Sequence, residues 1–359
     1  MSKLDAQSVK DALKACKDPE TGRSVVDTEQ LGEVNVDGGV VSVTLNLASH
    51  SAPLRDDMRA AVVELLQARF SDAKQVQVTI GEHHRPPQKL GAIGLTAKSV
   101  IAVGSGKGGV GKSTVAACLA LGLKRAGCKV GLMDADVYGP SIPHLLGLHA
   151  TQQDVMGEKK LQPILADGLP VMSMGFLVPP GEAVVWRGPM LHGAVTQFLR
   201  DTDWGELDYL IIDMPPGTGD IALSLSQAIP LTGAVVVCTP QEVALLDAVK
   251  AIAMFRKVSI PVLGMVENMS GFICPDCNKR YDIFGSGGAR AKAEQLGVPF
   301  LGELPINMAI RSHGDEGKTI ENFSDPQATP YLEKLVYRLS RYLADQAIAS
   351  PPRPSLPVL

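Results

Sequence analysis

The chain has 359 residues, 45% of them hydrophobic, which is enough to bury a large core and to build two domains. Its 34 lysines and arginines against 38 acidic residues give a formal net charge of −4, so no basic surplus points to nucleic-acid binding. No apolar run reaches the length of a membrane span, and the first residues lack the apolar stretch of a signal peptide. We therefore expect a cytoplasmic protein that binds neither nucleic acid nor membrane.

Residues 1–80 are predicted to form a small α+β domain. Asp37-Gly38-Gly39 lies between two runs of alternating apolar and polar residues, which predicts a β-hairpin. A helix is expected from Arg55 to Phe70, and residues 76–80 then repeat the strand period. The pattern predicts one half-buried sheet with helices on one side.

The rest of the chain divides into three parts. Prolines, glycines and polar residues without either period mark a linker over residues 81–98. From residue 99 to residue 349, continuous apolar runs alternate with helical stretches, which predicts an α/β domain with a mainly parallel sheet covered on both faces. The runs are "VIAVG", "KVGLMDAD", "YLIIDMPPG", "GAVVVCTP" and "PVLGMVENM". Residues 350–359 form a proline-rich tail.

A phosphate-binding motif opens the second domain. Residues 106–113 match G-x-x-x-x-G-K-[ST], and they follow an apolar run and precede a helical stretch, as this motif requires. Backbone N–H groups of such a loop surround phosphate oxygens, Lys112 neutralises the terminal phosphates, and the Ser113 hydroxyl can bind Mg²⁺. The residues expected to bind ATP here are Gly106, Lys107, Gly108, Gly109, Val110, Gly111, Lys112, Ser113 and Thr114.

Three carboxylates at predicted strand ends are candidates for metal binding and hydrolysis. Asp213 ends the run "YLIID" and resembles the aspartate of a Walker B strand, so we expect it to hold a water of the Mg²⁺ ion. Asp134 and Asp136 end the run "KVGLMDAD", from which a loop could face the γ-phosphate. Asp136 could instead be a helix cap or a turn residue.

Six cysteines are too few for a disulfide framework in a chain of this length, and Cys274 and Cys277 form the close pair "CPDC". The spacing suits half of a zinc site, a redox disulfide or half of an iron–sulfur site. The other cysteines are scattered, and Cys118 and Cys238 fall in a predicted helix and strand, where cysteine is usually a small core residue. One chain therefore offers two ligands, and a four-thiolate cluster would need two chains.

Four segments, in this order, resemble the Mrp/ApbC family of P-loop ATPases, which are iron–sulfur cluster carriers related to MinD and the nitrogenase iron protein. They are "KGGVGKST", "DADVYGPS", "DMPPGTGD" and "ENMSGFICPDC". The resemblance covers nearly the whole chain, including "WRGPM" at residues 186–190 and an N-terminal domain similar to that of iron–sulfur assembly proteins. It implies an α/β fold with a deviant Walker A motif. Ser51 stands where such N-terminal domains often carry a cysteine, so we expect no cluster ligand there.

The resemblance also implies roles for individual residues. Lys107 would be the extra lysine that reaches the nucleotide of the facing subunit in a homodimer. Asp136 would position the hydrolytic water, and Asp134 would support the Mg²⁺ shell. Asn268 is expected to read the adenine base, although its position also suits a turn at a strand end. The cysteine pairs of two chains would hold one 4Fe–4S cluster.

We therefore expect an ATP-hydrolysing homodimer that binds a labile 4Fe–4S cluster between its subunits and passes it to apo iron–sulfur proteins, with assembly scaffold proteins as further partners. Two alternatives stay open. One is a positioning or partitioning ATPase of the MinD/ParA type, against which the proline-rich C-terminus and the lack of a basic surplus count. The other is an ATPase whose cysteine pair holds a structural zinc ion.

Overall fold

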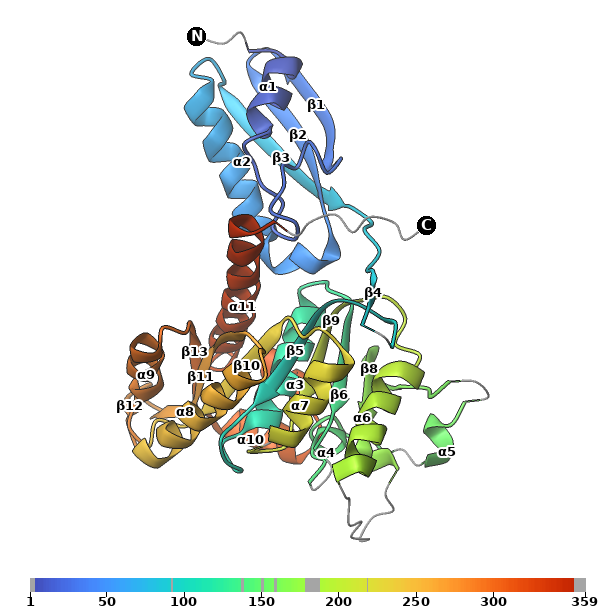
Figure 1. Ribbon diagram of the computed structural model, residues 1–359. Coiled ribbons are helices and arrows are strands. Elements are labelled where there is room, and N and C mark those ends of the chain that lie inside the picture. The colour runs from blue at the N-terminus through green and yellow to red at the C-terminus, as the bar shows by residue number, and fades with distance from the viewer. Residues whose placement is uncertain are drawn as a thin grey trace. The chain divides into compact units, whose positions relative to one another are not determined.

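The computed structural model describes residues 4–91, 93–136, 139–149, 152–157, 160–177, 188–217 and 219–351. The chain forms two compact units (Figure 1). The smaller unit comprises residues 1–86, 126–128 and 337–359, and the larger unit comprises residues 87–125 and 129–336. Trp186 and Arg187 of the "WRGPM" segment, and residues 352–359 of the tail, lie outside the described residues.

The smaller unit is a three-stranded sheet with two α-helices, which confirms the small α+β domain predicted at this end of the chain. Its elements are α1 (Ala6–Leu13), β1 (Leu31–Asp37), β2 (Val40–Leu47), α2 (Arg55–Arg69) and β3 (Gln75–Glu82). Gly38 and Gly39 both have positive φ angles, 55° and 86°, which a tight two-residue hairpin turn requires, so β1 and β2 pair antiparallel. Strand β3 returns parallel to β2 after helix α2.

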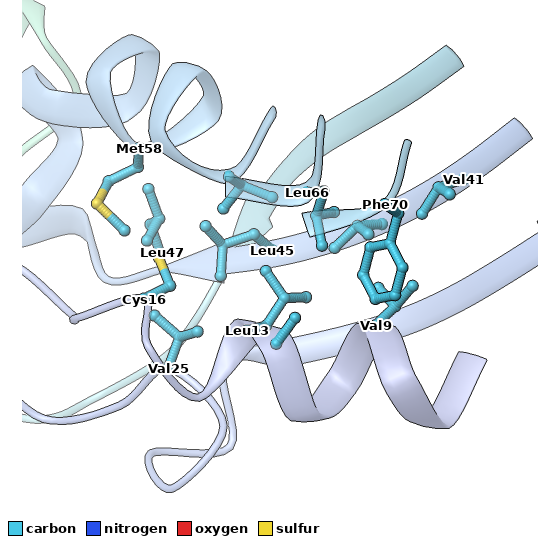
Figure 2. Packing of buried hydrophobic residues seen from close by; sticks show 13 residues of the cluster. Val9, Leu13, Cys16, Val25, Val41, Leu45, Leu47, Met58, Leu66 and Phe70 are labelled. Carbon is cyan, nitrogen blue, oxygen red and sulfur yellow. The ribbon is translucent and has the colours of Figure 1, made fainter. Parts of the chain in front are cut away.

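Alternation along β2 builds the core of this unit. Its inward side chains are at most 2% exposed: Val41, Val43, Leu45 and Leu47. Figure 2 shows this face packed against Leu13 of α1 and Leu66 of α2. Because burying one such side chain stabilises the fold by about 1.5–3 kcal/mol, a one-residue slip of β2, which would turn all four outward, is strongly disfavoured.

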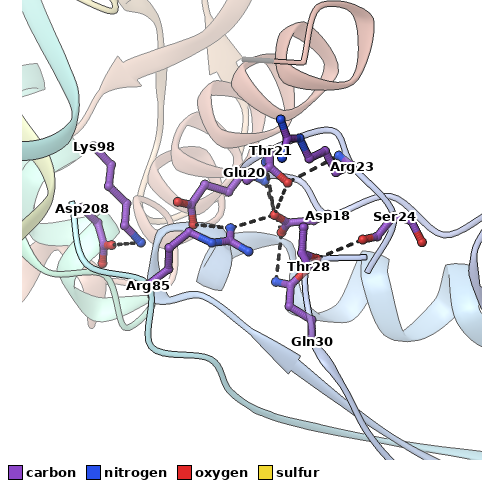
Figure 3. A network of polar contacts seen from close by, with 10 residues as sticks. All are labelled: Asp18, Glu20, Thr21, Arg23, Ser24, Thr28, Gln30, Arg85, Lys98 and Asp208. Atoms are coloured by element: carbon purple, nitrogen blue, oxygen red, sulfur yellow. Dashed lines mark hydrogen bonds and ion pairs between the residues drawn. The ribbon is translucent and has the colours of Figure 1, made fainter. Parts of the chain in front are cut away.

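A buried aspartate holds three loop segments of the smaller unit together. Asp18 is fully buried and accepts hydrogen bonds from Thr21 Oγ1 at 2.7 Å, Gln30 Nε2 at 3.1 Å and Arg85 Nη1 at 2.8 Å (Figure 3). Burial alone would raise the pKa of Asp18, but the Thr21 hydroxyl, the Arg85 charge and the Gln30 amide hold it below its usual value. The carboxylate therefore stays charged and fixes the segment that follows β3.

The predicted linker, residues 81–98, contains more regular structure than its composition indicates. Residues 81 and 82 complete β3, and in the larger unit β4 (Lys89–Leu90) pairs antiparallel with the start of β5 (Leu95–Gly104). Gly91 and Gly94 turn this short hairpin with φ angles of 60° and 70°. Lys98 is 9% exposed and pairs at 3.1 Å with Asp208, so the end of the segment is part of the larger unit (Figure 3).

The larger unit is built on a mainly parallel sheet, as the apolar runs predicted. The strand order is β12-β11-β10-β5-β9-β6-β8-β7, with β13 beside β11 and β4 beside β5. The further strands are β6 (Val130–Asp134), β7 (Ile164–Ala166), β8 (Leu169–Ser173), β9 (Leu207–Asp213), β10 (Gly233–Cys238), β11 (Val262–Ile273), β12 (Arg280–Tyr281) and β13 (Phe300–Ile306). Only β4, β7 and β12 are antiparallel to their neighbours among the described strands of this unit.

Helices connect these strands, and two more helices, α10 and α11, follow the last strand (Figure 1). They are α3 (Lys112–Arg125), α4 (Ile142–Leu145), α5 (Gln152–Val155), α6 (Gly188–Asp201), α7 (Gly219–Ala228), α8 (Glu242–Lys257), α9 (Gly288–Leu296), α10 (Met308–Asp315) and α11 (Thr329–Ala349). The division by sequence assigned all of α11 to the ATPase domain, residues 99–349. In the structure its second half groups with the smaller unit, because Tyr337 and Arg341 both contact the Asp57 carboxylate, at 2.7 Å and 3.4 Å.

Parallel strands bring the predicted site residues to one edge of the sheet. Strands β5, β6, β9, β10 and β11 all run in the same direction, so their carboxyl ends lie at the same edge. Asp134 at the end of β6 and Asp213 at the end of β9 are direct partners in the strand register. In sheets of this kind, ligands bind outside the carboxyl ends of the strands.

Candidate functional site

The phosphate loop joins β5 to α3. Gly109 and Gly111 both have a φ of 79°, a left-handed conformation that an L side chain rarely adopts, so this loop path depends on glycine. Gly106 has a different reason: a Cβ atom there would lie 2.1 Å from the backbone oxygen of Asp247 on α8. The loop can therefore turn its N–H groups inward toward an anion at the start of α3.

The two lysines of the loop are held differently. The Nζ atom of Lys112 lies 2.6 Å from Asp213 Oδ1 and donates to Ser113 Oγ at 3.1 Å, and the side chain is only 7% exposed. Lys107 is half-buried, lines the pocket and has no ion-pair partner among the described residues. One lysine thus compensates a buried carboxylate, while the other is free to bind an incoming group.

Asp213 has a buried carboxylate oxygen that is not hydrogen-bonded within the described part of the chain. This oxygen is Oδ2, and the side chain as a whole is fully buried. Burial raises the pKa of Asp213 and the Lys112 ammonium opposes that rise. A buried carboxylate oxygen without a partner is costly, and it suits a cation or a metal-bound water.

Asp134 and Asp136 form a small hydrogen-bonded turn beside Asp213. Asp134 is fully buried and accepts from Asp136 N at 3.1 Å, Ile142 N at 3.2 Å and Ser173 Oγ at 3.0 Å. Burial, with the nearby charge of Asp213, raises the pKa of Asp134 to about 8. Asp136 is 7% exposed and lines the pocket, so its carboxylate meets any ligand there.

An open pocket of about 300 Å³ lies over the loop. Its wall includes the loop residues from Lys107 to Thr114 except Val110, together with Asp136, Ser141 and Pro216. This volume is at the small end of the usual range for ligand sites. The structure thus brings together the predicted phosphate loop and Asp136, with Asp134 and Asp213 beneath them.

Asn268 on β11 contacts the phosphate loop itself. Its Nδ2 atom donates to the backbone oxygen of Val110 at 2.9 Å, and a Cβ atom on Gly111 would lie 2.1 Å from that Nδ2 atom. The contact places the residue beside the phosphate loop. Its role as an adenine-reading residue stays a prediction.

The cysteine pair lies on a hairpin between β11 and β12. Cys274 N donates to Lys279 O at 3.0 Å, Asn278 N donates to Cys274 O at 2.9 Å, and Asn278 has a left-handed φ of 56°. Backbone N–H groups of Cys277 and Asp276 hold the pKa of the Cys274 thiol below its usual value. Cys274 is half-buried and Cys277 exposed, so this tight turn leaves both thiols accessible from solvent.

The other four cysteines are buried thiols that form no disulfide, as expected of core residues. Burial raises the pKa of Cys118 and Cys238 to about 12 and that of Cys16 to about 11, so these thiols stay protonated. Among the described residues, no group of three or more His, Cys, Asp or Glu side chains could hold a metal ion. Within one chain, the hairpin therefore offers two accessible thiols.

A polar network beside the hairpin was missed by the sequence interpretation. Glu267 is fully buried and accepts hydrogen bonds from Gly287 N at 2.7 Å, Ala289 N at 2.6 Å and Ser270 Oγ at 2.6 Å. Arg280 Nη2 donates to Ser270 O at 3.1 Å. A glutamate inside the apolar run "PVLGMVENM" was the available signal, because a buried charge requires partners.

Fold and site together define the class of protein: a P-loop NTPase with a second lysine in its phosphate loop. A family model described as NUBPL iron-transfer P-loop NTPase matches residues 96–340, and one described as iron-sulfur cluster assembly protein matches residues 6–80. The chain belongs to the family of iron-transfer P-loop NTPases, which confirms the resemblance found in the sequence.

Individual relatives agree with this assignment. The chain is 48% identical over 310 residues to an iron-sulfur cluster carrier protein of Deinococcus radiodurans, covering 85% of this chain and 86% of the relative. It is 41% identical to one of Haemophilus influenzae, covering 96% and 93%. Among solved structures, a nucleotide-binding protein of Archaeoglobus fulgidus in complex with ADP matches with a TM-score of 0.57 and 42% identity, covering 66% of this chain and 92% of that one. Within the described part of the chain, no helix has the length and apolar character needed to cross a membrane.

Proposed function

We propose that this protein is an ATP-hydrolysing carrier that binds a labile 4Fe–4S cluster between two identical subunits and passes it to apo iron–sulfur proteins. The observation that carries the proposal is the accessible thiol pair at the end of β11, in the same compact unit as a complete phosphate loop. The relatives named iron-sulfur cluster carrier proteins support the choice of cargo. The ADP complex of the archaeal relative supports the choice of nucleotide.

Nucleotide binding begins with an exchange of partners at Lys112. Its Nζ atom is paired with Asp213, and the phosphate oxygens of ATP compete for the same ammonium group. Once Lys112 turns to the phosphates, Asp213 is released, and together with the Ser113 hydroxyl it would hold a hydrated Mg²⁺ ion, which neutralises phosphate charge. The partnerless Oδ2 atom of Asp213 fits this role.

Hydrolysis needs a water held in line with the γ-phosphate. Asp136 is the carboxylate on the pocket wall and is the residue we assign to that water. Asp134 acts from beneath, because its hydrogen bonds to Asp136 N, Ile142 N and Ser173 Oγ fix the turn that carries Asp136. Lys107 has no ion-pair partner among the described residues and would reach the nucleotide of the second subunit.

The cluster would be bound at the hairpin. Cys274 and Cys277 of each chain supply two thiolates, and a 4Fe–4S cluster takes four, so two chains complete one site. The lowered pKa of Cys274 favours the thiolate that binds iron. Exposure of Cys277 leaves the cargo within reach of a recipient protein.

The test uses matched variants to separate cluster binding at the cysteine pair from ATP hydrolysis at the phosphate loop. Cys274→Ser with Cys277→Ser should lose at least about nine-tenths of the iron and sulfide after anaerobic reconstitution, because both thiolates of each chain, and so all four of the dimer, are removed. The same variant should keep ATPase activity within about twofold. Cys16→Ala, which alters a buried thiol, should keep both properties. Asp136→Asn should keep its iron and lose hydrolysis. A cysteine double variant that retains the wild-type iron content, or a wild-type protein that takes up only zinc, would contradict the proposal.

A further inference from the structure

Strand β11 passes from the phosphate loop to the cysteine hairpin. Asn268 contacts the loop, and Ile273, the last residue of the strand, precedes Cys274. One strand therefore contacts the phosphate loop and leads directly into the cysteine hairpin. A rigid element that contacts two sites is a physical route for coupling between them when it has two arrangements.

Asn268 forms a short hydrogen bond with the phosphate loop. Asn268 Nδ2 donates to Val110 O at 2.9 Å, inside the loop that would surround the phosphates. Gly111 makes this approach possible, because a Cβ atom there would lie 2.1 Å from the same nitrogen. Movement of the loop on phosphate binding must therefore either carry Asn268 along or break this hydrogen bond.

The middle of the strand is irregular. Met269 and Gly271 have left-handed φ angles of 59° and 70°, and the pairing with β13 shifts register between Asn268 and Phe272. A non-glycine residue in this region is uncommon and costs about 1 kcal/mol or more. Such bulges redirect side chains and are frequent beside active sites. Residues 268–271, called here the β11 bulge, are thus a place where the strand can change conformation.

Hydrogen bonds join Ser270 of the β11 bulge to Arg280 on the strand that follows the cysteine hairpin. Ser270 is fully buried, and its hydroxyl donates to Glu267 Oε1 at 2.6 Å. Arg280 Nη2 donates to the Ser270 carbonyl at 3.1 Å, and its Nη1 donates to Glu303 Oε1 at 3.2 Å. Arg280 also pairs with Ile273 across the hairpin, so it joins the bulge to the strand that returns from the cysteines.

We propose that Asn268 is a positioning residue of the phosphate loop, and that the β11 bulge and Arg280 couple the state of that loop to the Cys274–Cys277 hairpin. The proposal rests on the proposed function only in that the hairpin is taken as the cluster site. Coupling between two binding sites is reciprocal. Nucleotide must therefore alter the affinity of the two thiols for their ligand by the same factor by which that ligand alters the affinity for nucleotide. Coupling energies of this kind usually correspond to factors of about 5–150.

The experiment uses the full chain, reduced and free of iron and zinc, so its outcome does not depend on cluster loading. The rate of Cys277 alkylation by iodoacetamide is followed by peptide mass spectrometry with and without saturating Mg·ADP. We expect the two rates of the wild type to differ by at least about fivefold. Arg280→Lys, which keeps the charge but loses the planar fork, should bring the ratio below about twofold while ADP affinity stays within about threefold.

Two controls fix the interpretation. Arg311→Lys alters an arginine that is 72% exposed on α10 and should keep the wild-type ratio. Asn268→Ala should weaken the affinities for Mg·ADP and Mg·GDP by the same factor of at least about fivefold, because it disturbs the phosphate loop and not the site of the base. Asn35→Ala in the smaller unit should change neither affinity. Loss of ADP affinity alone would overturn the positioning role. Equal alkylation rates in the wild type with and without Mg·ADP, or an unchanged ratio in Arg280→Lys, would overturn the coupling.

Discussion

Replacing Lys112 by alanine removes the cation that compensates the buried carboxylate of Asp213. The two side chains are 7% and 0% exposed and lie 2.6 Å apart, so solvent cannot replace the lost charge. Breaking a buried pair from one side costs about 3–5 kcal/mol if the remaining charge stays. The carboxylate has an alternative, which is to take up a proton. Since the pKa of Asp213 is already raised above 3.8, protonation at pH 7 costs less than about 4 kcal/mol, at about 1.36 kcal/mol per pH unit.

We therefore expect Lys112→Ala to lower the free energy of unfolding of the larger unit by about 2–4 kcal/mol at pH 7, in addition to abolishing ATPase activity. The sign of the pH dependence follows from proton binding. In the variant, folded Asp213 binds a proton more tightly than unfolded Asp213, so the stability of the variant falls as pH rises above about 4. The deficit relative to the wild type should shrink at pH 5.

Urea unfolding followed by tryptophan fluorescence measures this quantity, because Trp186 and Trp204 both fall within the residue range of the larger unit. Adding Asp213→Asn to Lys112→Ala should recover most of the lost stability without restoring ATPase activity. Lys160→Ala, which removes an exposed pair with Asp203, should cost less than about 1 kcal/mol. A Lys112→Ala variant as stable as the wild type at pH 7, or a double variant no more stable than the single one, would refute the reasoning.

Three further outcomes are expected. Gly106→Ala should weaken ADP binding at least about tenfold, since its methyl group would lie 2.1 Å from a backbone oxygen of α8. Gly108→Ala should bind ADP normally, because the nearest atom lies 3.9 Å from its methyl group. Isothermal calorimetry measures both affinities, and equal values would contradict the packing described for the loop. Asp18→Asn should speed hydrogen exchange of β2 amides at pH 7 in the full chain. The difference should begin to shrink as pH falls below about 4 and should vanish below the lowered pKa of folded Asp18, because the hydrogen bonds stabilise only its ionised form. A pH-independent difference would contradict this. Lys107→Ala and Asp136→Asn should each lack ATPase activity, but mixed dimers should regain part of it, and no recovery would show that Lys107 acts within its own subunit.

Sequence patterns predicted the features that depend on local chemistry. Continuous apolar runs identified the parallel strands, Asp37-Gly38-Gly39 identified the hairpin turn, and the glycine–lysine spacing identified the phosphate loop. Because parallel strands end at one edge, the meeting of Asp134 with Asp213 could also be expected. Each of these follows from periodicity or from a backbone conformation that few residues adopt.

The contacts that join distant parts of the chain could not be predicted in this way. The ion pair between Lys112 and Asp213 forms between two segments that are far apart in the chain, and it forms with no nucleotide bound. The hydrogen bond from Asn268 to Val110 O joins residues 158 positions apart. The division of α11 between two units likewise depends on Tyr337 finding Asp57, 280 residues away in the chain. Spacing within a single segment contains no information about such partners.

The most direct test of the proposed carrier is native mass spectrometry of the wild-type protein after anaerobic reconstitution with iron and sulfide. The account predicts a dimer carrying one 4Fe–4S cluster, which separates into cluster-free monomers when a chelator removes the iron, because each chain contributes only Cys274 and Cys277. A cluster bound to a monomer, or a dimer that holds a single zinc ion and takes up no iron, would contradict it.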